Sequence, residues 1–168
     1  LTARPWGSGG IPDGFAFESL PVDFPHLEPL LETAMARFQG LESVGIQLLF
    51  NGPESFTPDD RYLLGETPEV ADLFVACGFN SIGIQSAGGA GKVLAEWIVR
   101  GRPPMDLWDV DIRRTFSYQS NKEFLRERTT ETLGLLYDMH WPHRQYATGR
   151  NVFLSPLHQK LLDSGAVM

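Results

Sequence analysis

The stretch from Leu73 to Ile98 constrains the fold of this chain more than any other part of it. Its first residues, Leu73–Cys77, form a continuous apolar run of strand length, which is typical of a sheet covered on both faces. A turn rich in glycine follows, and the apolar residues after it recur at helical spacing. Those residues are Ala90, Val93, Leu94, Trp97 and Ile98. The pattern predicts a strand, a tight turn and a helix in succession.

The expected helix carries a second ridge made of very small side chains, Ala87, Gly91 and Ala95. Glycine inside a helix costs about 1 kcal/mol relative to alanine, so the ridge indicates close approach to a sheet or to a bound group. The free N–H groups at a helix start attract oxyanions and polarised carbonyls. Two interpretations stay open: a cofactor's negative edge resting on residues 83–89, or a close-packed corner without a ligand.

The N-terminal half predicts several further elements. Leu27–Phe38 has the i, i+3, i+4, i+7 spacing of an amphipathic helix, with Asp23 and Pro25 at its start and Gly40 beyond its end. Val44–Phe50 alternates and predicts a strand. Residues 15–20 have the pattern of a short strand, and residues 54–68 are expected to be mostly loop.

The C-terminal half begins at a predicted boundary. Gly101–Pro104 ends the central helix and separates residues 1–102 from residues 103–168. A weakly amphipathic helix is expected over Asn121–Tyr137, and His140–His143 breaks it. These elements together predict the α+β fold class.

Charge and cysteine usage exclude some functions. The net charge of -7 disfavours nucleic acid, which needs a basic face. No run reaches the roughly 20 apolar residues of a membrane span, so none is predicted. Cys77 is the single cysteine, which fits a reducing compartment, and its apolar neighbours predict a small buried side chain. The chain starts at Leu1 without an initiator Met, so we expect the native N-terminus to lie elsewhere.

Few side chains make a convincing catalytic or metal site on their own. His140 and His143 form an H-x-x-H pair with His158 far away, but Pro142 between them argues against a shared helix face. Asp59-Asp60 is interpreted as a turn cap in preference to a pair of catalytic carboxylates.

A set of short motifs nevertheless extends along nearly the whole chain. They are Gly52–Asp59, Leu64–Val70, Cys77–Gly83, Gly88–Ile98, Asp111–Arg114, Arg126–Arg128 and Ser155–His158. In combination they resemble the FAD-dependent sarcosine and dimethylglycine dehydrogenase family. The resemblance implies a piece of a longer protein. Residues 1–102 would end a flavin and substrate domain, with a mixed sheet and packed helices, and residues 103–168 would begin the central domain.

The resemblance also implies a cofactor site. Its expected residues line the isoalloxazine ring of FAD: Asn80, Ser81, Ile82, Gly83, Ile84 and Gln85. Gln85 stands where simpler sarcosine oxidases carry a lysine near the substrate carboxylate, and an amide supplies a hydrogen bond without a full charge. Pro53 stands where those oxidases attach flavin through a cysteine, so no such linkage is implied here. No catalytic residue is assigned, because the resemblance places those upstream.

The implied reaction oxidises an N-methyl amine of a glycine derivative by hydride transfer to FAD. A flavoprotein or oxygen would accept the electrons, and tetrahydrofolate would capture the one-carbon unit in a domain outside this chain. The implied compartment is the mitochondrial matrix in a eukaryote or the cytoplasm in a bacterium. The isolated piece is expected to be inactive, with the apolar face of Val44–Phe50 exposed.

An alternative of a different class is open. The regulatory subunit of pyruvate dehydrogenase phosphatase, an interaction protein without catalytic activity, resembles the same stretch. The resemblance includes Leu136–Met139 and Thr148–Arg150.

Overall fold

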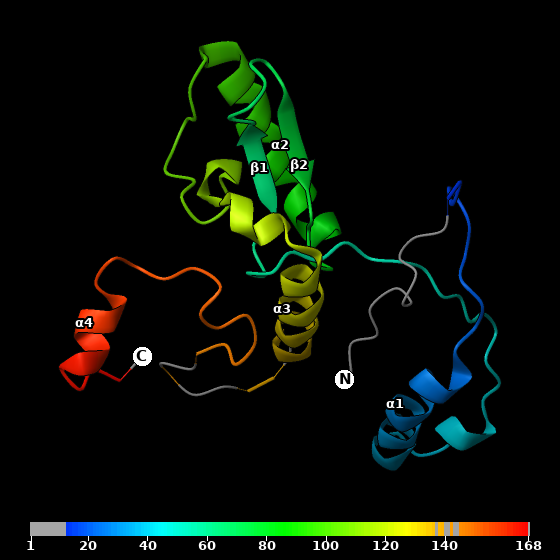
Figure 1. Cartoon of the computed structure of the whole chain (residues 1–168). Helices are drawn as coiled ribbons and strands as arrows, with labels where there is room; N and C mark the ends of the chain where they lie inside the picture. Colours follow the sequence, from blue (N-terminus) through cyan, green and yellow to red (C-terminus); the bar gives the residue numbers. More distant parts are fainter. Residues whose placement is uncertain (1–12, 137, 140–141, 143–144, 168) are drawn as a thin grey trace. The chain divides into compact units, whose positions relative to one another are not determined.

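The computed structural model describes residues 13–136, 138–139, 142 and 145–167. These residues fall into two compact units, 13–54 and 55–167. The elements, with η for a 3-10 helix, are drawn in Figure 1. They run in the order α1 (Phe24–Arg37), η1 (Leu41–Ser43), β1 (Leu63–Glu66), β2 (Phe74–Cys77), α2 (Gly83–Arg100), η2 (Ile112–Arg114), η3 (Ser117–Ser120), α3 (Lys122–Leu135) and α4 (His158–Asp163).

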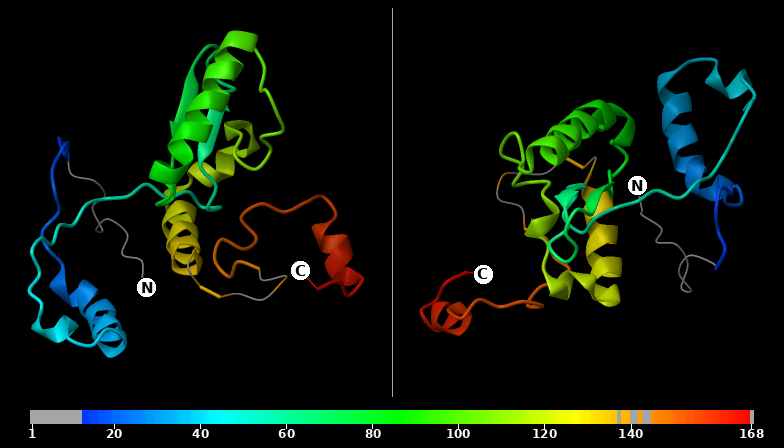
Figure 2. Two further views of the ribbon diagram at one scale, coloured as in Figure 1. Left: turned by 180° about the vertical axis from the view of Figure 1, so that it is seen from behind. Right: turned by 90° about the horizontal axis from the view of Figure 1, so that it is seen from above.

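The second unit is built around an antiparallel strand pair. β1 pairs with β2 from Leu63 opposite Cys77 to Glu66 opposite Phe74. α2 lies along one face of this pair (Figure 2). A single parallel bridge joins Leu64 to Asp111, just before η2. Helices with a small sheet are compatible with a piece of a flavin oxidoreductase domain, whereas the larger mixed sheet stays a prediction.

Trp97 is the centre of the small core. Its side chain is 2% exposed, and Leu64 and Ala90 are buried with it. The ring of Phe74 meets the indole edge-on, with 6.1 Å between the centroids. The Arg113 guanidinium lies 5.3 Å from the indole centroid, within the range of a cation–π contact. The helix face predicted for Ala90 and Trp97 is therefore the one that packs on the sheet.

The strand pair both confirms and corrects the sequence predictions. β2 and α2 form where they were expected, and α2 ends at Gly101 in the left-handed conformation with φ of +67°. Residues 54–68 are mostly loop, as predicted, but they also contain the four-residue strand β1, which was not predicted. The glycine that indicated a loop, Gly65, is instead the residue whose missing side chain makes room for the indole ring. Cys77 is exposed, not buried, because it ends a strand whose last two residues are uncovered.

The first unit contains α1, which begins and ends close to its predicted bounds. The Asp23 carboxylate accepts the His26 N–H at 3.1 Å, and Pro25 occupies the first turn. Gly40 takes a left-handed φ of +87° beyond the end of the helix. Capping therefore fixes the helix bounds from local sequence alone.

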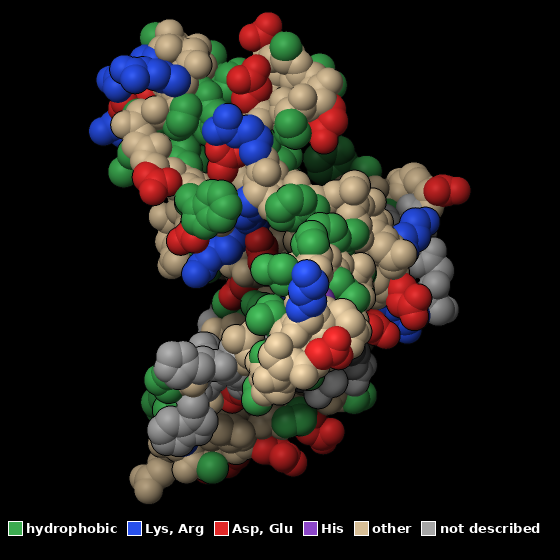
Figure 3. Space-filling model, turned by 60° about the vertical axis from the view of Figure 1, so that its left-hand side comes forward, with side chains coloured by type: hydrophobic (Ala, Val, Ile, Leu, Met, Phe, Trp, Pro, Cys, Tyr) green, Lys and Arg blue, Asp and Glu red, His purple; other side chains and the backbone are tan. Residues whose placement is uncertain are grey.

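The strands predicted upstream were wrong. Residues 44–50 form no strand in the described structure. Next to the two segments, Leu20 and Asn51 form a single antiparallel bridge, and the Asn51 side chain donates to the Pro21 carbonyl at 3.0 Å. A period of two supplies the side-chain pattern of a strand, but the ladder also needs a neighbouring strand to bond with. The alternating residues Val44, Ile46, Leu48 and Phe50 are all exposed, as expected for that apolar face. Hydrophobic side chains also reach the surface elsewhere, in the separate patches of Figure 3.

The helix predicted in the C-terminal half is confirmed as α3, whereas α4 forms where no element was predicted. The Asn121 side chain caps α3 by accepting the N–H groups of Glu123 and Phe124. The predicted break at His140–His143 lies mostly outside the described residues. Residues on both sides of position 102 belong to one compact unit, and the division there stays a prediction. Within the described part of the chain, no helix is long and apolar enough to cross a membrane.

We expect Gly65→Ala to destabilise the chain by about 2–4 kcal/mol. A Cβ atom at this position would lie 2.4 Å from the buried indole of Trp97, and the φ of +112° disfavours any side chain. Urea unfolding monitored by Trp fluorescence measures the change. The control is Gly91→Ala, where a Cβ meets nothing within 4 Å and helix propensity favours alanine. Equal stability of the two variants would contradict the close packing of Gly65 on the indole.

Candidate functional site

The turn between β2 and α2 has an unusual backbone. Gly78, Asn80 and Ser81 all have positive φ angles, of 66°, 49° and 64°. The left-handed region disfavours side chains other than glycine, although asparagine tolerates it better than most. Two adjacent residues of this kind persist only when their surroundings hold them.

The Asn80 side chain supplies that support. It is 2% exposed. Its carboxamide oxygen accepts the Thr57 N–H at 2.8 Å, and its nitrogen donates to the Gly78 carbonyl at 2.8 Å and to the Thr57 hydroxyl at 3.1 Å. The Asn80 N–H donates to the Ser55 carbonyl at 3.1 Å. The turn is therefore bonded to the segment around Thr57 through both the side chain and the backbone of one residue.

The Thr57 segment is itself held by residues far along the chain. The Thr132 hydroxyl on α3 donates to the Pro58 carbonyl at 3.1 Å. The Arg114 guanidinium on η2 donates to both carboxylate oxygens of Asp59, at 2.7 and 3.0 Å, and to the Arg61 carbonyl at 2.6 Å. Paired bonds of this kind fix geometry as well as adding energy.

Asp59 also confirms the prediction of a turn cap. Its Oδ1 accepts the Arg61 N–H two residues on, at 3.2 Å. The neighbouring Asp60 has a φ of +58° and one buried carboxylate oxygen, Oδ1, without a hydrogen-bond partner in the described structure. Burial raises the pKa of Asp60, the charge of Arg61 opposes this and the charge of Asp59 adds to it.

The start of α2 is open. Ile82 is its N-cap residue and makes no side-chain capping bond to the first N–H groups of the helix. The Ile84 side chain is fully exposed, and a Cβ added at Gly88 or Gly89 would meet nothing within 4 Å. The helix is 18 residues long, and its dipole places about half a positive charge at this end. Such an end can hydrogen-bond a negatively polarised edge.

The six predicted site residues thus divide into two groups. Asn80 is buried and bonds inward. The other residues stand at or before the open helix start: Ser81, Ile84 and Gln85 are exposed, and Ile82 and Gly83 are half-buried. Thr57, Asp59, Arg114 and Thr132 complete the support of the turn, and sequence reasoning gave them no such role. Thr57 and Asp59 belong to the Gly52–Asp59 motif found in the sequence. No local pattern, however, shows which distant residues bond to this motif.

Comparison with known families decides the affiliation of the chain. The family model described as FAD dependent oxidoreductase matches residues 2–97. The chain belongs to the FAD-dependent oxidoreductase family. A second model, FAD dependent oxidoreductase central domain, matches residues 100–155.

Individual relatives of this FAD-dependent oxidoreductase chain come from bacteria and from mitochondria. It is 46% identical over 150 residues to 4-methylaminobutanoate oxidase (formaldehyde-forming) of Paenarthrobacter nicotinovorans, covering 89% of this chain and 18% of the relative. Mouse mitochondrial sarcosine dehydrogenase is 42% identical over 158 residues, 94% of this chain and 17% of the relative. The mouse mitochondrial pyruvate dehydrogenase phosphatase regulatory subunit is 39% identical over 178 residues, 97% of this chain and 20% of the relative. The chain thus spans about a fifth of the length of these relatives.

The open helix start has hydrogen-bond donors of the kind that the edge of a flavin would need. The pyrimidine edge of a flavin carries carbonyl groups and gathers negative charge on reduction, which N–H groups and a positive dipole end stabilise. The exposed first turn leaves these donors uncapped by side chains, and the glycines that follow leave room beside them. The residues present therefore suit the pyrimidine edge of FAD.

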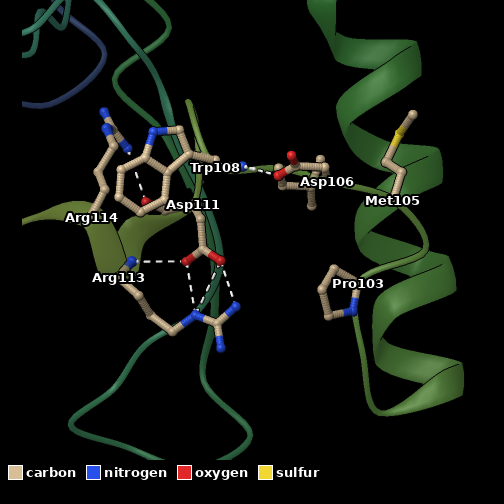
Figure 4. Close-up of a pocket in the computed structure, with 8 residues that line it drawn as sticks. Pro103, Met105, Asp106, Trp108, Asp111, Arg113 and Arg114 are labelled. Carbon is tan, nitrogen blue, oxygen red and sulfur yellow. Dashed lines mark hydrogen bonds and ion pairs between the residues drawn. The ribbon is translucent and has the colours of Figure 1, made fainter.

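A hollow elsewhere on the chain is a weaker candidate for a ligand site (Figure 4). It has a volume of about 380 Å³ and is lined in part by Met105, Trp108, Asp111 and Arg113. Two of its charged residues are already paired with each other, since Arg113 Nε donates to both oxygens of Asp111 at 3.0 Å. Burial raises the pKa of Asp111, but the hydrogen bonds and charge of Arg113, with the charge of Arg114, lower it overall. Among the described residues, no group of three or more potential metal ligands is present.

A separate cluster ties α3 to the segment after it. The Glu131 carboxylate accepts the N–H groups of Ala147 and Thr148 at 2.7 and 2.8 Å and also the Thr148 hydroxyl. Arg128 donates to the Thr148 carbonyl and lies 4.4 Å from the Tyr146 ring centroid. The cluster fixes the backbone around Thr148–Arg150, one of the motifs on which the expected resemblance to the regulatory subunit rests.

We expect Glu131→Gln to cost about 1–2 kcal/mol of stability at neutral pH, because an amide nitrogen would face backbone donors. Burial raises the pKa of Glu131, but hydrogen bonds from Ala147 and Thr148 and the charge of Arg128 outweigh it, so the pKa is lowered overall. A lowered pKa means that the stabilisation is present above the ordinary value of 4.5 and is lost as pH falls through the folded-state value.

Urea unfolding of both proteins at pH 7 and pH 3 checks this. The stability difference between wild type and variant should shrink at the lower pH. A difference that stays constant would contradict the bonded carboxylate. Glu127→Gln, on the exposed side of the same helix, is the control and should change little at either pH.

Proposed function

We propose that this chain is part of a flavoprotein that oxidises N-methyl amines of amino acids, with sarcosine and dimethylglycine as the expected glycine derivatives. The family match and the relatives named for 4-methylaminobutanoate and sarcosine support the reaction class. The observation that carries the proposal at the level of residues is the open start of α2, after a turn held in a left-handed conformation.

In this proposal the segment Ser81–Gln85 lines the isoalloxazine ring of FAD. The first N–H groups of α2 point out of the helix and would donate to the pyrimidine carbonyls. When bound, FAD supplies the hydride acceptor for oxidation of the N-methyl group. The contribution of this chain is to orient the ring and to favour negative charge at its edge through the helix dipole.

Gln85 would face the substrate end of the ring. Its side chain is exposed at the first turn of α2. A neutral carboxamide can donate one hydrogen bond to a carboxylate, which is weaker than the charge-assisted bond of a lysine. We therefore assign Gln85 a minor part in holding the substrate and expect the main anchor to lie elsewhere in the protein.

The remaining partners follow from the same family assignment. Tetrahydrofolate would accept the one-carbon unit in a domain outside this chain, and a flavoprotein or oxygen would accept the electrons. The matches at residues 2–97 and 100–155 support a division near position 102, between the end of the flavin domain and the start of the central domain. The compartment would be the mitochondrial matrix in a eukaryotic source or the cytoplasm in a bacterial one.

A regulatory, non-catalytic function is the second candidate. It is favoured by the relative that regulates pyruvate dehydrogenase phosphatase, which matches 97% of this chain at 39% identity. The enzyme proposal requires a functional flavin contact at α2, whereas the regulatory one does not. Flavin chemistry in the whole protein therefore separates the two.

We expect Ile84→Asp to weaken FAD binding by the whole protein by about tenfold or more, since it places a carboxylate beside a negatively polarised edge. Its stability should be unchanged or slightly higher, because an acidic residue favours the first turn of a helix. The control is Val99→Asp, which adds the same charge at an exposed position near the other end of α2. Isothermal titration with FAD compares the three proteins. Equal FAD affinity of all three proteins would contradict the placement of Ile84 beside the flavin.

A further inference from the structure

We infer that Asn80 is a positioning residue for the flavin, acting through Thr57, and that its side chain does not touch the ring. The inference rests on the proposed function of the turn as the flavin contact. It assigns a role to Thr57 and changes the role that the resemblance implies for Asn80.

The hydrogen bonds of Asn80 leave no polar group for a ligand. Its oxygen accepts from the Thr57 N–H, and its nitrogen donates to Gly78 and to the Thr57 hydroxyl, over 2.8–3.1 Å. The side chain is 2% exposed. Turning the carboxamide toward a bound ring would leave buried polar groups unpaired, which destabilises the folded state.

The same bonds determine where α2 begins. Asn80 and Ser81 are both left-handed, and the chain enters the helix two residues later, at Gly83. Backbone conformations of this kind are unfavourable for residues other than glycine unless other contacts hold them. Without the bond to Thr57 the turn would relax, and the first N–H groups of the helix would lose their direction.

Thr57 suits the role of anchor because it is held on several sides. Its hydroxyl donates to the Arg61 carbonyl at 2.9 Å while it accepts from Asn80. Its methyl group fills the space over Gly78, where an added Cβ would come within 2.7 Å of Cγ2. The next residues are tied to Thr132 and Arg114. The anchor therefore connects the turn to η2 and α3, within the part matched by the central-domain model.

This arrangement predicts how the variants affect flavin affinity. The apparent dissociation constant rises in proportion to the loss of the competent conformation. Thr57→Val keeps the shape and the backbone N–H but removes the hydroxyl. The Asn80 amide nitrogen then keeps only its bond to the Gly78 carbonyl, and the Arg61 carbonyl keeps only its bond from Arg114. We expect about a tenfold weaker FAD affinity and a more negative flavin reduction potential.

The test compares wild type, Thr57→Val, Asn80→Ala and the double variant in the whole flavoprotein. Affinity for FAD and the flavin reduction potential are measured for each. If Asn80 acts through Thr57, the double variant should bind FAD about as weakly as the weaker single variant. Thr57→Ser keeps the hydroxyl, so its affinity for FAD should lie within about twofold of the wild-type value. Thr67→Val is the matched control, since it removes an exposed hydroxyl bond to Val70 away from the turn.

Two results would overturn the inference. One is a loss of affinity in Asn80→Ala with none in Thr57→Val, and the other is additive losses in the double variant; both indicate direct contact of Asn80 with the ring. Hydrogen exchange at the backbone amides of Asn80 and Ile82 measures how well the turn is held when no flavin is bound. Exchange should quicken in Thr57→Val and not in Thr57→Ser, and unchanged exchange also overturns the inference. If the wild-type protein binds no FAD, that result would instead contradict the proposed function.

Discussion

The hydrogen bonds between Asn80 and Thr57 are the interaction on which the candidate site depends. They join a turn in an unfavourable backbone conformation to a segment that is fixed by Arg114 and Thr132. A turn of this kind is stable only if its partner is rigid, and here the partner is bonded to η2 and to α3. The start of α2 thus obtains its direction from residues that lie on both sides of the proposed domain boundary.

This dependence has a consequence for function. A helix start exposes N–H groups in any protein, but a ligand benefits only when those groups are held in place before it binds. The Asn80 network supplies such preorganisation at the turn that we propose as the flavin contact. The scaffold alone does not decide between enzyme and regulator, because both classes are found among the relatives of this chain.

Local signals in the sequence were sufficient for α1, α2, α3 and β2, whereas α4 was not predicted. The capping residues Asp23 and Asn121 and the left-handed Gly101 mark ends that depend on neighbours within a few residues. β1 was missed, because only the distant Trp97 explains why a glycine stands in a strand.

The strand predicted at residues 44–50 is absent from the described structure, because no neighbouring strand pairs with this segment. Here the local pattern was present and the distant partner was missing. In the site, the resemblance pointed to the turn, while the inward orientation of Asn80 follows from contacts with Thr57 that lie 23 residues away in sequence.

The most direct measurement of the central claim is hydrogen exchange of the whole protein with and without FAD, followed at the backbone amides of Gly83, Ile84 and Gln85. These amides open α2 and have no partner within the helix, so they should exchange quickly without flavin and slowly once it is bound. Amides near Gly101, at the far end of α2, should change little. Flavin that binds tightly while the three amides exchange as before would contradict the assignment of this helix start as the flavin contact.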